Sequence, residues 1–144
     1  MAVDPRVVPF KRHHYDWLRE SNPTADGGAF AAPEGVLSQL ERQNSWTGVI
    51  DGTPITCAGT IQQWPGRHTA WAYMGRNTGR HMVWITRAVL ANLATVEGRV
   101  ELTVRADFAL GQRWAEMLGF RVETPRLEQY GPQGEDHVGY VRVN

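Results

Sequence analysis

The segment Gly75-Arg76-Asn77-Thr78-Gly79-Arg80 combines residue types that can bind an anion. The glycines permit backbone angles closed to other residues, Thr78 can cap a helix that begins near Arg80, and the arginines carry positive charge. Several backbone N–H groups would then point outward at the positive end of a helix dipole, which attracts phosphate or carboxylate groups. The alternative is that the glycines only form a turn and that the arginines are solvated.

This turn is predicted to join a strand to a long amphipathic helix. Strand residues Ala70–Met74 are apolar or aromatic throughout, which is typical of a strand covered on both faces in the middle of a sheet. The helix is indicated by apolar residues at spacings of three or four, with Gly98 as its end: Met82, Ile85, Val89, Leu93 and Val96.

The remaining segments predict a strand, two helices and a hairpin before this unit, and a strand, a helix and two strands after it. The preceding segments are Val7–Phe10, a helix from about Arg12 to Glu20, a surface loop 21–33, a helix from Pro33 to about Gln43, and the hairpin Trp46–Ile50 with Ile55–Gln63 around Asp51-Gly52. The following segments are Arg99–Arg105, Ala109–Leu118 with Asp107 as a possible N-cap, Phe120–Leu127 and Val138–Val143. The order β-α-α-β-β-β-α-β-α-β-β predicts an α/β fold of the α+β type, with a mixed, mostly antiparallel sheet of about six to seven strands.

Composition restricts the class of protein. The 144 residues are 42% hydrophobic, which predicts one domain, residues 1–144, with a substantial core. The formal net charge is zero, which argues against a nucleic-acid binder. Cys57 is the single cysteine and the five histidines have no metal-like spacing, so neither a disulfide nor a zinc site is expected. Because no apolar run approaches about 18 residues and no signal peptide is recognised, we expect a cytoplasmic protein without a membrane span.

The element order resembles that of the Gcn5-related N-acetyltransferase (GNAT) superfamily, over essentially the whole chain. Three stretches carry the resemblance: the turn at residues 75–80, the unit VRADFALGQRWAEMLGF at residues 104–120, and the closing hairpin. The resemblance implies acetyl-CoA as co-substrate, an amine acceptor of unknown identity, and a turn whose backbone amides hold the CoA pyrophosphate.

The GNAT turn pattern R/Q-x-x-G-x-G/A fits this sequence in two registers. One register uses Arg76 and Gly79 with His81 in the position of a small residue, and the other ends at Gly79 with Asn77 for a glycine and Met74 for the arginine. The residues that the resemblance implies for cofactor binding are Ala72, Tyr73, Met74, Gly75, Arg76, Asn77, Thr78, Gly79, Arg80 and His81.

The family's N-x-x-A-x-x-x-Y-x-x-x-G-F unit ends here at Gly119-Phe120. In this register Phe108 stands where asparagine is common, Gly111 replaces alanine, and Ala115 takes the place of the tyrosine that often acts as general acid. The neighbouring Trp114 is expected in the core.

Three residues are candidates for proton transfer during acetylation. Many GNAT enzymes use a glutamate near the central strand, because an ammonium substrate must lose a proton before it attacks a thioester. Strand Ala70–Met74 has no carboxylate, and its Tyr73, with an ordinary pKa of about 10, suits an acid. Glu101 and Asp107 are candidate bases, with an exposed strand position and a helix cap as the respective alternatives. Catalysis without these groups is still possible, since orientation and a backbone N–H can polarise the thioester.

A different class of function is also open. The segment ETPRLEQYGPQGEDHVGYVRV, residues 123–143, looks like GNAT-like proteins of tailed bacteriophages, some of them internal virion proteins. That resemblance implies a catalytically degenerate GNAT-fold protein with a structural or host-interaction role, located in the virion or the host cytoplasm. A small-molecule or CoA sensor without turnover is a third possibility.

Two loops are predicted to shape the acceptor site, and one tryptophan is predicted to belong to a surface that binds another protein. Residues 21–32 and 128–136 would shape the acceptor site, and Trp64 is expected to be partly exposed, in a surface for a phage or host protein or for a second copy of the chain. The strands Ala70–Met74 and Arg99–Arg105 are predicted to be parallel neighbours, joined by a right-handed crossover and separating toward their carboxyl ends.

Overall fold

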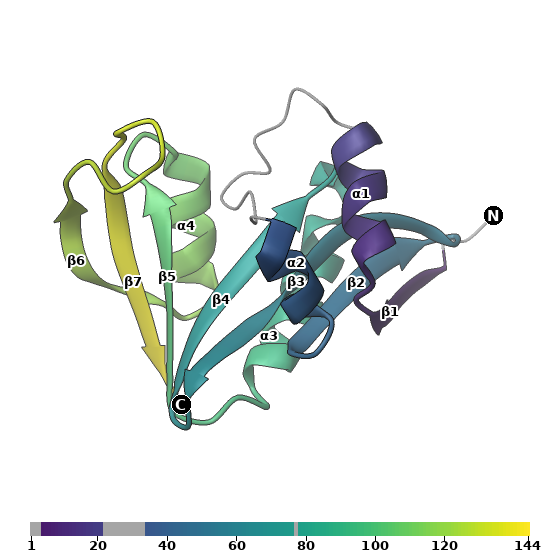
Figure 1. Cartoon of the computed structure of the whole chain (residues 1–144), viewed down its shortest axis with the longest axis horizontal. Helices are drawn as coiled ribbons and strands as arrows, with labels where there is room; N and C mark the ends of the chain where they lie inside the picture. Colours follow the sequence, from purple (N-terminus) through teal and green to yellow (C-terminus); the bar gives the residue numbers. More distant parts are fainter. Residues whose placement is uncertain (1–3, 22–33, 77) are drawn as a thin grey trace.

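A computed structural model describes residues 4–21, 34–76 and 78–144, with one mixed seven-stranded sheet (Figure 1). Along the chain the elements are β1 (Pro5–Pro9), α1 (Arg12–Ser21), α2 (Glu34–Leu40), β2 (Asn44–Ile50), β3 (Thr53–Trp64), β4 (Arg67–Met74), the 3₁₀ turn η1 (Gly79–His81), α3 (Met82–Leu93), β5 (Arg99–Arg105), α4 (Ala109–Met117), β6 (Arg121–Leu127) and β7 (His137–Val143). The strands lie in the order β1-β2-β3-β4-β5-β7-β6. This architecture confirms the predicted fold class and element order.

Strands β4 and β5 are parallel neighbours for only part of their length. Their paired residues are Arg67–Thr69 with Arg99–Glu101, and beyond these positions the two strands separate. All other neighbouring strands pair antiparallel. Figure 1 shows the resulting V, closed at the beginning of β4 and β5 and open at their carboxyl ends. The predicted parallel pairing and separation are therefore confirmed.

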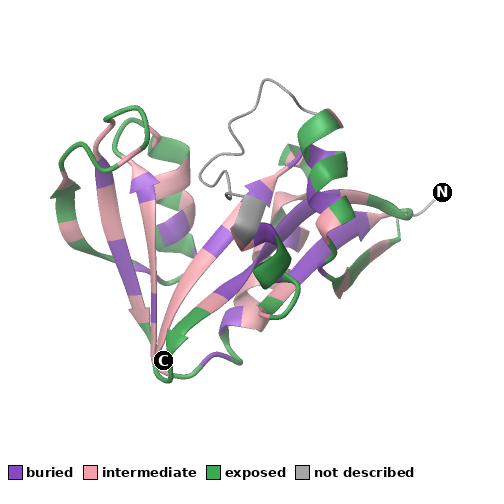
Figure 2. Ribbon diagram, in the orientation of Figure 1, coloured by how far each residue is buried: buried purple, intermediate pink, exposed green. Residues whose placement is uncertain are grey.

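Each face of the sheet carries its own hydrophobic cluster and pair of helices. On one face, α1 and α2 pack on β3 and β4 through Tyr15, Leu18, Leu37, Leu40, Cys57, Trp71 and Tyr73. On the other face, α3 and α4 pack on β5 and β7 through Leu93, Val96, Val100, Val104, Ala115, Leu118, Phe120 and Tyr140. Figure 2 shows buried residues interspersed with less buried ones along β5 and β7. The two clusters hold the two arms of the V, and the sheet itself joins them.

The burial of β4 differs from the predicted full coverage of both faces. Trp71 and Tyr73 are buried toward α1 and α2, whereas Ala72 and Met74 are only partly buried and line the opening of the V. The physical reason is the separation of β5, which removes one lateral neighbour from the second half of β4.

The long helix ends earlier than its apolar stripe indicates. Helix α3 stops at Leu93, and the side-chain amide of Asn144 donates to the carbonyl oxygens of Leu93 and Val96, at 2.8 Å and 2.6 Å. Val96 stays buried beyond the helix end. Gly98, predicted to terminate the helix, instead lies against the backbone of Gly66 at the closed end of the V, where a Cβ would be 2.6 Å from the Gly66 carbonyl oxygen.

Two predicted helix caps are wrong. Thr78 precedes η1 in a helical backbone conformation and makes no side-chain capping bond, so the chain enters α3 through η1 without a side-chain cap. The N-cap position of α4 is Phe108, also without a capping bond, and Asp107 contacts Arg105 instead. The predicted loop 21–33 lies outside the described residues except for Ser21, which belongs to α1.

Trp64, at the end of β3, is 57% exposed, as expected from the sequence. The guanidinium carbon of Arg67 lies 4.6 Å from the centroid of the Trp64 ring. The exposed indole is therefore held against a cation at the closed end of the V. A partner on this surface stays a prediction.

Candidate active site

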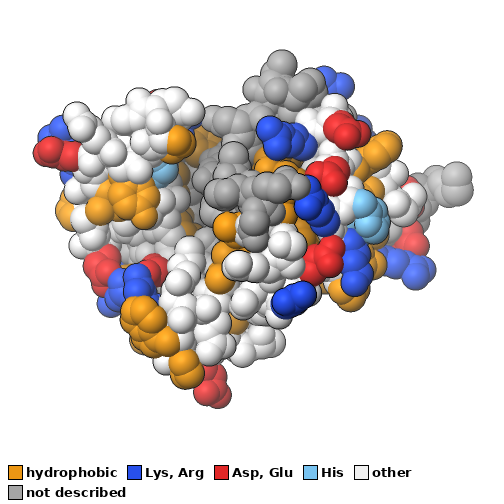
Figure 3. All heavy atoms as spheres, viewed as in Figure 1, with side chains coloured by type: hydrophobic (Ala, Val, Ile, Leu, Met, Phe, Trp, Pro, Cys, Tyr) orange, Lys and Arg blue, Asp and Glu red, His pale blue; other side chains and the backbone are white. Residues whose placement is uncertain are grey.

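The separated strands β4 and β5 open a cleft of about 1920 Å³. Ala72 of β4 and Leu102 of β5 both line it, together with residues of α1, α3, α4, β7 and the segment between β6 and β7. On the face drawn in Figure 3, charged side chains gather over α1 and near the closed end of the V. A cleft of this volume can admit an extended ligand at the edge of the sheet.

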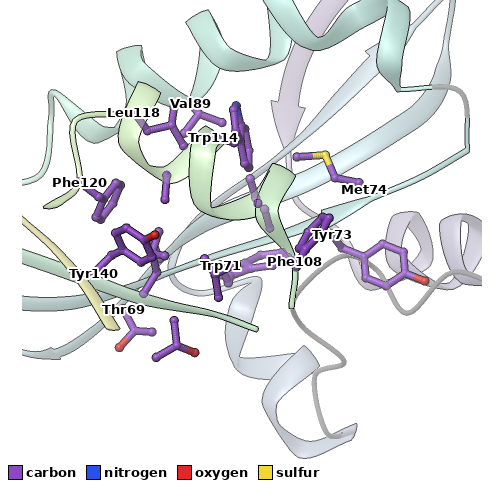
Figure 4. Close-up of a pocket in the computed structure, with 18 of the residues that line it drawn as sticks. Thr69, Trp71, Tyr73, Met74, Val89, Phe108, Trp114, Leu118, Phe120 and Tyr140 are labelled. Carbon is purple, nitrogen blue, oxygen red and sulfur yellow. The ribbon is translucent and has the colours of Figure 1, made fainter. Parts of the chain in front are cut away.

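One wall of the cleft is hydrophobic, and a hydrogen bond joins the two helices that form it. Figure 4 shows the side chains that line this part of the cleft, among them Val89 of α3, Trp114 of α4, Leu118, Phe120, Tyr140 and Met74 of β4. The indole Nε1–H of Trp114 donates to Oγ1 of Thr86 at 2.9 Å, which joins α4 to α3. Trp114 packs against the core as expected, but it also lines the cleft.

The turn Gly75–His81 lies at the carboxyl end of β4, beside the cleft. Thr78 and Met82 are among the lining residues, and the Arg76 and Arg80 side chains are exposed. The first turn of α3 contains no acidic residue. An anion would therefore meet positive charge and a helix N-terminus here, with no carboxylate of that first turn to repel it. Asn77 lies outside the described residues.

The two glycines of this turn have different surroundings. Neither glycine has a positive φ. The prediction from the sequence that the backbone angles of this turn require glycine is therefore wrong. A Cβ on Gly75 would lie 2.5 Å from Cδ2 of Leu18 and 2.8 Å from the carbonyl oxygen of Ile55, so Gly75 is required by packing. A Cβ on Gly79 would meet nothing within 4 Å. The open space at Gly79 leaves room for a ligand to approach the backbone closely.

Tyr73 lines the cleft but is mostly enclosed by protein. It is 3% exposed, and its ring lies against Tyr15 of α1 with 5.0 Å between centroids. Its backbone carbonyl accepts a hydrogen bond from Thr56 at 2.9 Å. These contacts place Tyr73 in the cluster beneath α1 and α2.

Glu101 lies at the closed end of the V, where β4 and β5 are still paired. Its carboxylate accepts hydrogen bonds from Nε of Arg67 at 2.8 Å and from Nε of Arg99 at 2.7 Å. Burial raises the pKa of Glu101, but the hydrogen bonds from Arg67 and Arg99 outweigh it and hold the pKa below its ordinary value. Arg99 also pairs with Glu123, which extends the network to β6.

Asp107 and Ala115 have different surroundings. Asp107 follows β5 at an exposed position, 3.0 Å from the Arg105 guanidinium. Ala115, at the position of the family's tyrosine, is buried between α4 and the sheet. Thus the structure does not bring Tyr73, Glu101 and Asp107 together as one hydrogen-bonded group.

A second set of polar residues in the cleft wall was not singled out from the sequence. Oγ1 of Thr103 lies 3.1 Å from Nδ1 of His137, and Oε1 of Glu135 lies 3.5 Å from Nε2 of the same ring. All three residues line the cleft. The only sequence signal is alternation along Arg99–Arg105, which places Thr103 on the same face as Glu101; nothing local indicates that His137 pairs beside it.

The described residues also bear on membrane and metal binding. No helix among them is long and apolar enough to cross a membrane. Nor do three or more His, Cys, Asp or Glu residues gather to hold a metal ion within the described part of the chain.

Several solved structures with a similar fold are named as acetyltransferases. No protein-family model and no curated protein matches the sequence. The chain is similar in structure to Ard1 from Thermoplasma volcanium, with a TM-score of 0.78 and 14% identity over 96% of this chain and 97% of that one. It is also similar to the ribosomal-protein-S18-alanine N-acetyltransferase from Escherichia coli, with a TM-score of 0.74 and 19% identity over 96% of this chain and 92% of that one. A GNAT-family acetyltransferase from Bacillus anthracis gives a TM-score of 0.69 and 12% identity over 96% and 94% of the two chains. The chain therefore has the fold of the GNAT acetyltransferases.

Proposed function

We propose that this chain is an acetyl-CoA-dependent N-acyltransferase that acetylates an amine. The observation that carries the proposal is the separation of β4 from β5 beyond Thr69 and Glu101, with the Gly79 turn at the open end. The separation leaves strand edges in a cleft, and the turn offers room for a pyrophosphate. The structural similarity to GNAT acetyltransferases supports the same function.

The turn and the cleft divide the binding of acetyl-CoA between them. We assign the pyrophosphate to backbone amides of the turn from Gly75 to His81, with Arg76 and Arg80 as counter-charges. The β4 edge at Ala72 and Met74 would face the pantetheine arm. Acetyl-CoA supplies an activated thioester, so the protein has to hold the amine against it and remove a proton.

The acceptor belongs to the class of primary amines in this proposal. A peptide with an amino-terminal alanine is the first substrate to try, because two of the similar structures are named as alanine acetyltransferases of ribosomal proteins. The segment between β6 and β7 lines the cleft through Tyr130, Gly131, Pro132 and Gln133, and we assign it to acceptor selection.

The proposal is tested by release of free CoA thiol from acetyl-CoA in the presence of a panel of amines. An enzyme raises thiol release above the rate without protein and forms an acetylated product of the expected mass. No turnover with any amine, together with no CoA binding, would refute the proposal and favour the structural virion role.

Variants of the three sequence candidates assign their roles in the same assay. Tyr73→Phe, Glu101→Gln and Asp107→Asn should each lower kcat about 10²- to 10⁴-fold if the group transfers a proton. A change in melting temperature with unchanged kcat assigns packing to Tyr73 and ion pairing to Glu101, and the contacts described above favour this second result.

A further inference from the structure

We propose that Thr103, His137 and Glu135 form a proton relay that removes a proton from the acceptor amine. This inference rests on the proposed acetyltransferase function. It assigns the proton transfer to a group of residues on β5, β7 and the segment before β7.

The three residues are linked in series. Thr103 of β5 and His137, the first residue of β7, lie on adjacent antiparallel strands, with Oγ1 and Nδ1 3.1 Å apart. Glu135 follows the turn between β6 and β7, and its Oε1 lies 3.5 Å from Nε2 of His137. If Nε2 carries the ring proton and faces the carboxylate, Nδ1 is left to accept a proton from the threonine hydroxyl.

The surroundings hold the imidazole in one orientation. His137 is 8% exposed, and the Tyr130 ring centroid lies 5.1 Å from the centroid of its ring. Gly131 packs so closely on Glu135 that a Cβ there would lie 1.7 Å from Oε1. An imidazole fixed between a hydroxyl and a carboxylate suits repeated proton transfer, because its geometry is set before substrate arrives.

The charged groups nearest to the relay have defined contacts. Arg105, the cross-strand partner of His137, contacts Asp107 at 3.0 Å, and Asp136 contacts Arg126 at 2.9 Å. The pKa of Glu135 is lowered, chiefly by a hydrogen bond from its own backbone N–H, and further by the Gln133 N–H and His137, although burial opposes this. Glu135 is therefore the carboxylate available to balance an imidazolium at His137.

The relay lies on the side of the sheet from which an amine can approach. Alternation along β5 puts Val100 and Val104 against α3 and α4, and puts Thr103 on the opposite face. Since Thr69 pairs with Glu101, this opposite face is shared with Thr69, Trp71 and Tyr73 of β4. The amine would thus enter from the side of α1 and α2, toward the same cleft that admits the thioester.

The proton balance of the step is complete. An acceptor ammonium gives one proton to the Thr103 hydroxyl as that hydroxyl passes its own proton to Nδ1 of His137. The neutral nitrogen then bonds to the thioester carbonyl carbon, and the carbon–sulfur bond breaks with its electron pair going to sulfur. Of the two protons that the nitrogen loses, one returns from the imidazolium to the thiolate through solvent and the other leaves to solvent.

The test combines turnover, pH dependence and CoA binding in His137→Gln and Thr103→Val. Each variant should lower kcat with acetyl-CoA and the best amine about 10²- to 10⁴-fold, with CoA-induced thermal stabilisation unchanged. The pH dependence of kcat should also change in His137→Gln, because the imidazole that accepts the proton is lost. Gly131→Ala, which displaces the Glu135 carboxylate without replacing it, should reduce kcat as Glu135→Gln does.

His68→Gln is the matched control. His68 is a partly buried strand histidine of β4 whose Nδ1 lies 3.3 Å from the Arg99 carbonyl oxygen, at the closed end of the V. It should leave kcat and its pH profile unchanged. Wild-type turnover with unchanged kcat in His137→Gln overturns the relay alone, whereas absence of wild-type turnover overturns the acetyltransferase function and the relay with it.

Discussion

The two glycines of the β4–α3 turn should respond in opposite ways to the same substitution. Gly75→Ala adds a methyl group 2.5 Å from Leu18 and 2.8 Å from the Ile55 carbonyl oxygen, and the latter is backbone that cannot rotate away. Gly79→Ala adds a methyl group into open space, at a φ outside the left-handed region. Gly75→Ala should therefore damage the fold, and Gly79→Ala should damage the ligand site.

The expected magnitudes follow from these contacts. Overpacking at Gly75 costs about 1 to 3 kcal/mol, which for a domain of this size lowers the melting temperature by roughly 3 to 15 °C. Gly79→Ala should leave the free protein unchanged or stabilise it by up to about 1 kcal/mol, because alanine has less conformational freedom in the unfolded chain.

The assay is thermal unfolding with and without CoA. At about 100 times its dissociation constant, CoA should stabilise the wild-type protein by ~2.7 kcal/mol, a shift of roughly 8 to 14 °C. Dephospho-CoA, which keeps the pyrophosphate, should retain most of the shift, and pantetheine should lose it. Gly79→Ala should reduce the CoA shift, and the bulkier Gly79→Val should abolish it in a protein that is folded without ligand.

Two results would refute this reasoning. A wild-type protein with no CoA-dependent shift at millimolar CoA has no pyrophosphate site at this turn. A Gly79→Val protein that is stabilised by CoA as strongly as the wild type would place the pyrophosphate elsewhere in the cleft.

Two further predictions concern stability and its dependence on pH. His14 accepts a hydrogen bond from the Lys11 backbone N–H at 3.1 Å and contacts Thr47 Oγ1 at 2.8 Å, and burial, followed by the nearby charges of His13 and Lys11, lowers its pKa. Because the folded state binds this proton less readily than the unfolded chain, the free energy of unfolding is highest above pH ~6.5 and falls below that pH by at most about 1.4 kcal/mol per pH unit. Urea unfolding should show a smaller fall with pH in His14→Asn than in the wild type. An equal fall in both proteins would contradict the assignment to His14. Glu101→Gln should cost about 1 to 2 kcal/mol, discounted for partial exposure, because Arg67 and Arg99 lose their shared carboxylate. Since the folded-state pKa of Glu101 is lowered, the difference in free energy of unfolding between wild type and Glu101→Gln should be complete above pH ~4.5 and shrink as the pH falls below it. If urea unfolding shows a difference that does not depend on pH, the effect of the substitution is one of packing instead.

Sequence patterns that act locally were sufficient to predict the order of the elements. The strand Arg99–Arg105 has the predicted bounds because alternation of apolar and polar residues is a property of the strand alone. The Asp51-Gly52 turn is confirmed by positive φ angles of 50° and 81°, which these residue types adopt in tight hairpins. The parallel pairing of β4 with β5 followed from the resemblance of the whole element order to GNAT proteins.

Tertiary contacts decided what the candidate residues do. Gly75 is required by Leu18, a residue far away in the sequence, and no local pattern at the turn contains that contact. The sequence pattern is compatible with an exposed strand position for Glu101. The role of Glu101 depends, however, on Arg67, because the pairing of β4 with β5 brings these two residues together.

The same limit applies to the proposed relay. Thr103 and His137 are separated by a helix and a strand along the chain, and they meet because β7 inserts between β5 and β6 in the sheet. Hydrogen bonds between side chains depend on strand register and on which face each residue occupies, and a shift of one residue would turn His137 away from Thr103. The sequence alone therefore determined which segments form the arms of the cleft, whereas the pairing of those arms determined which side chains face each other within it.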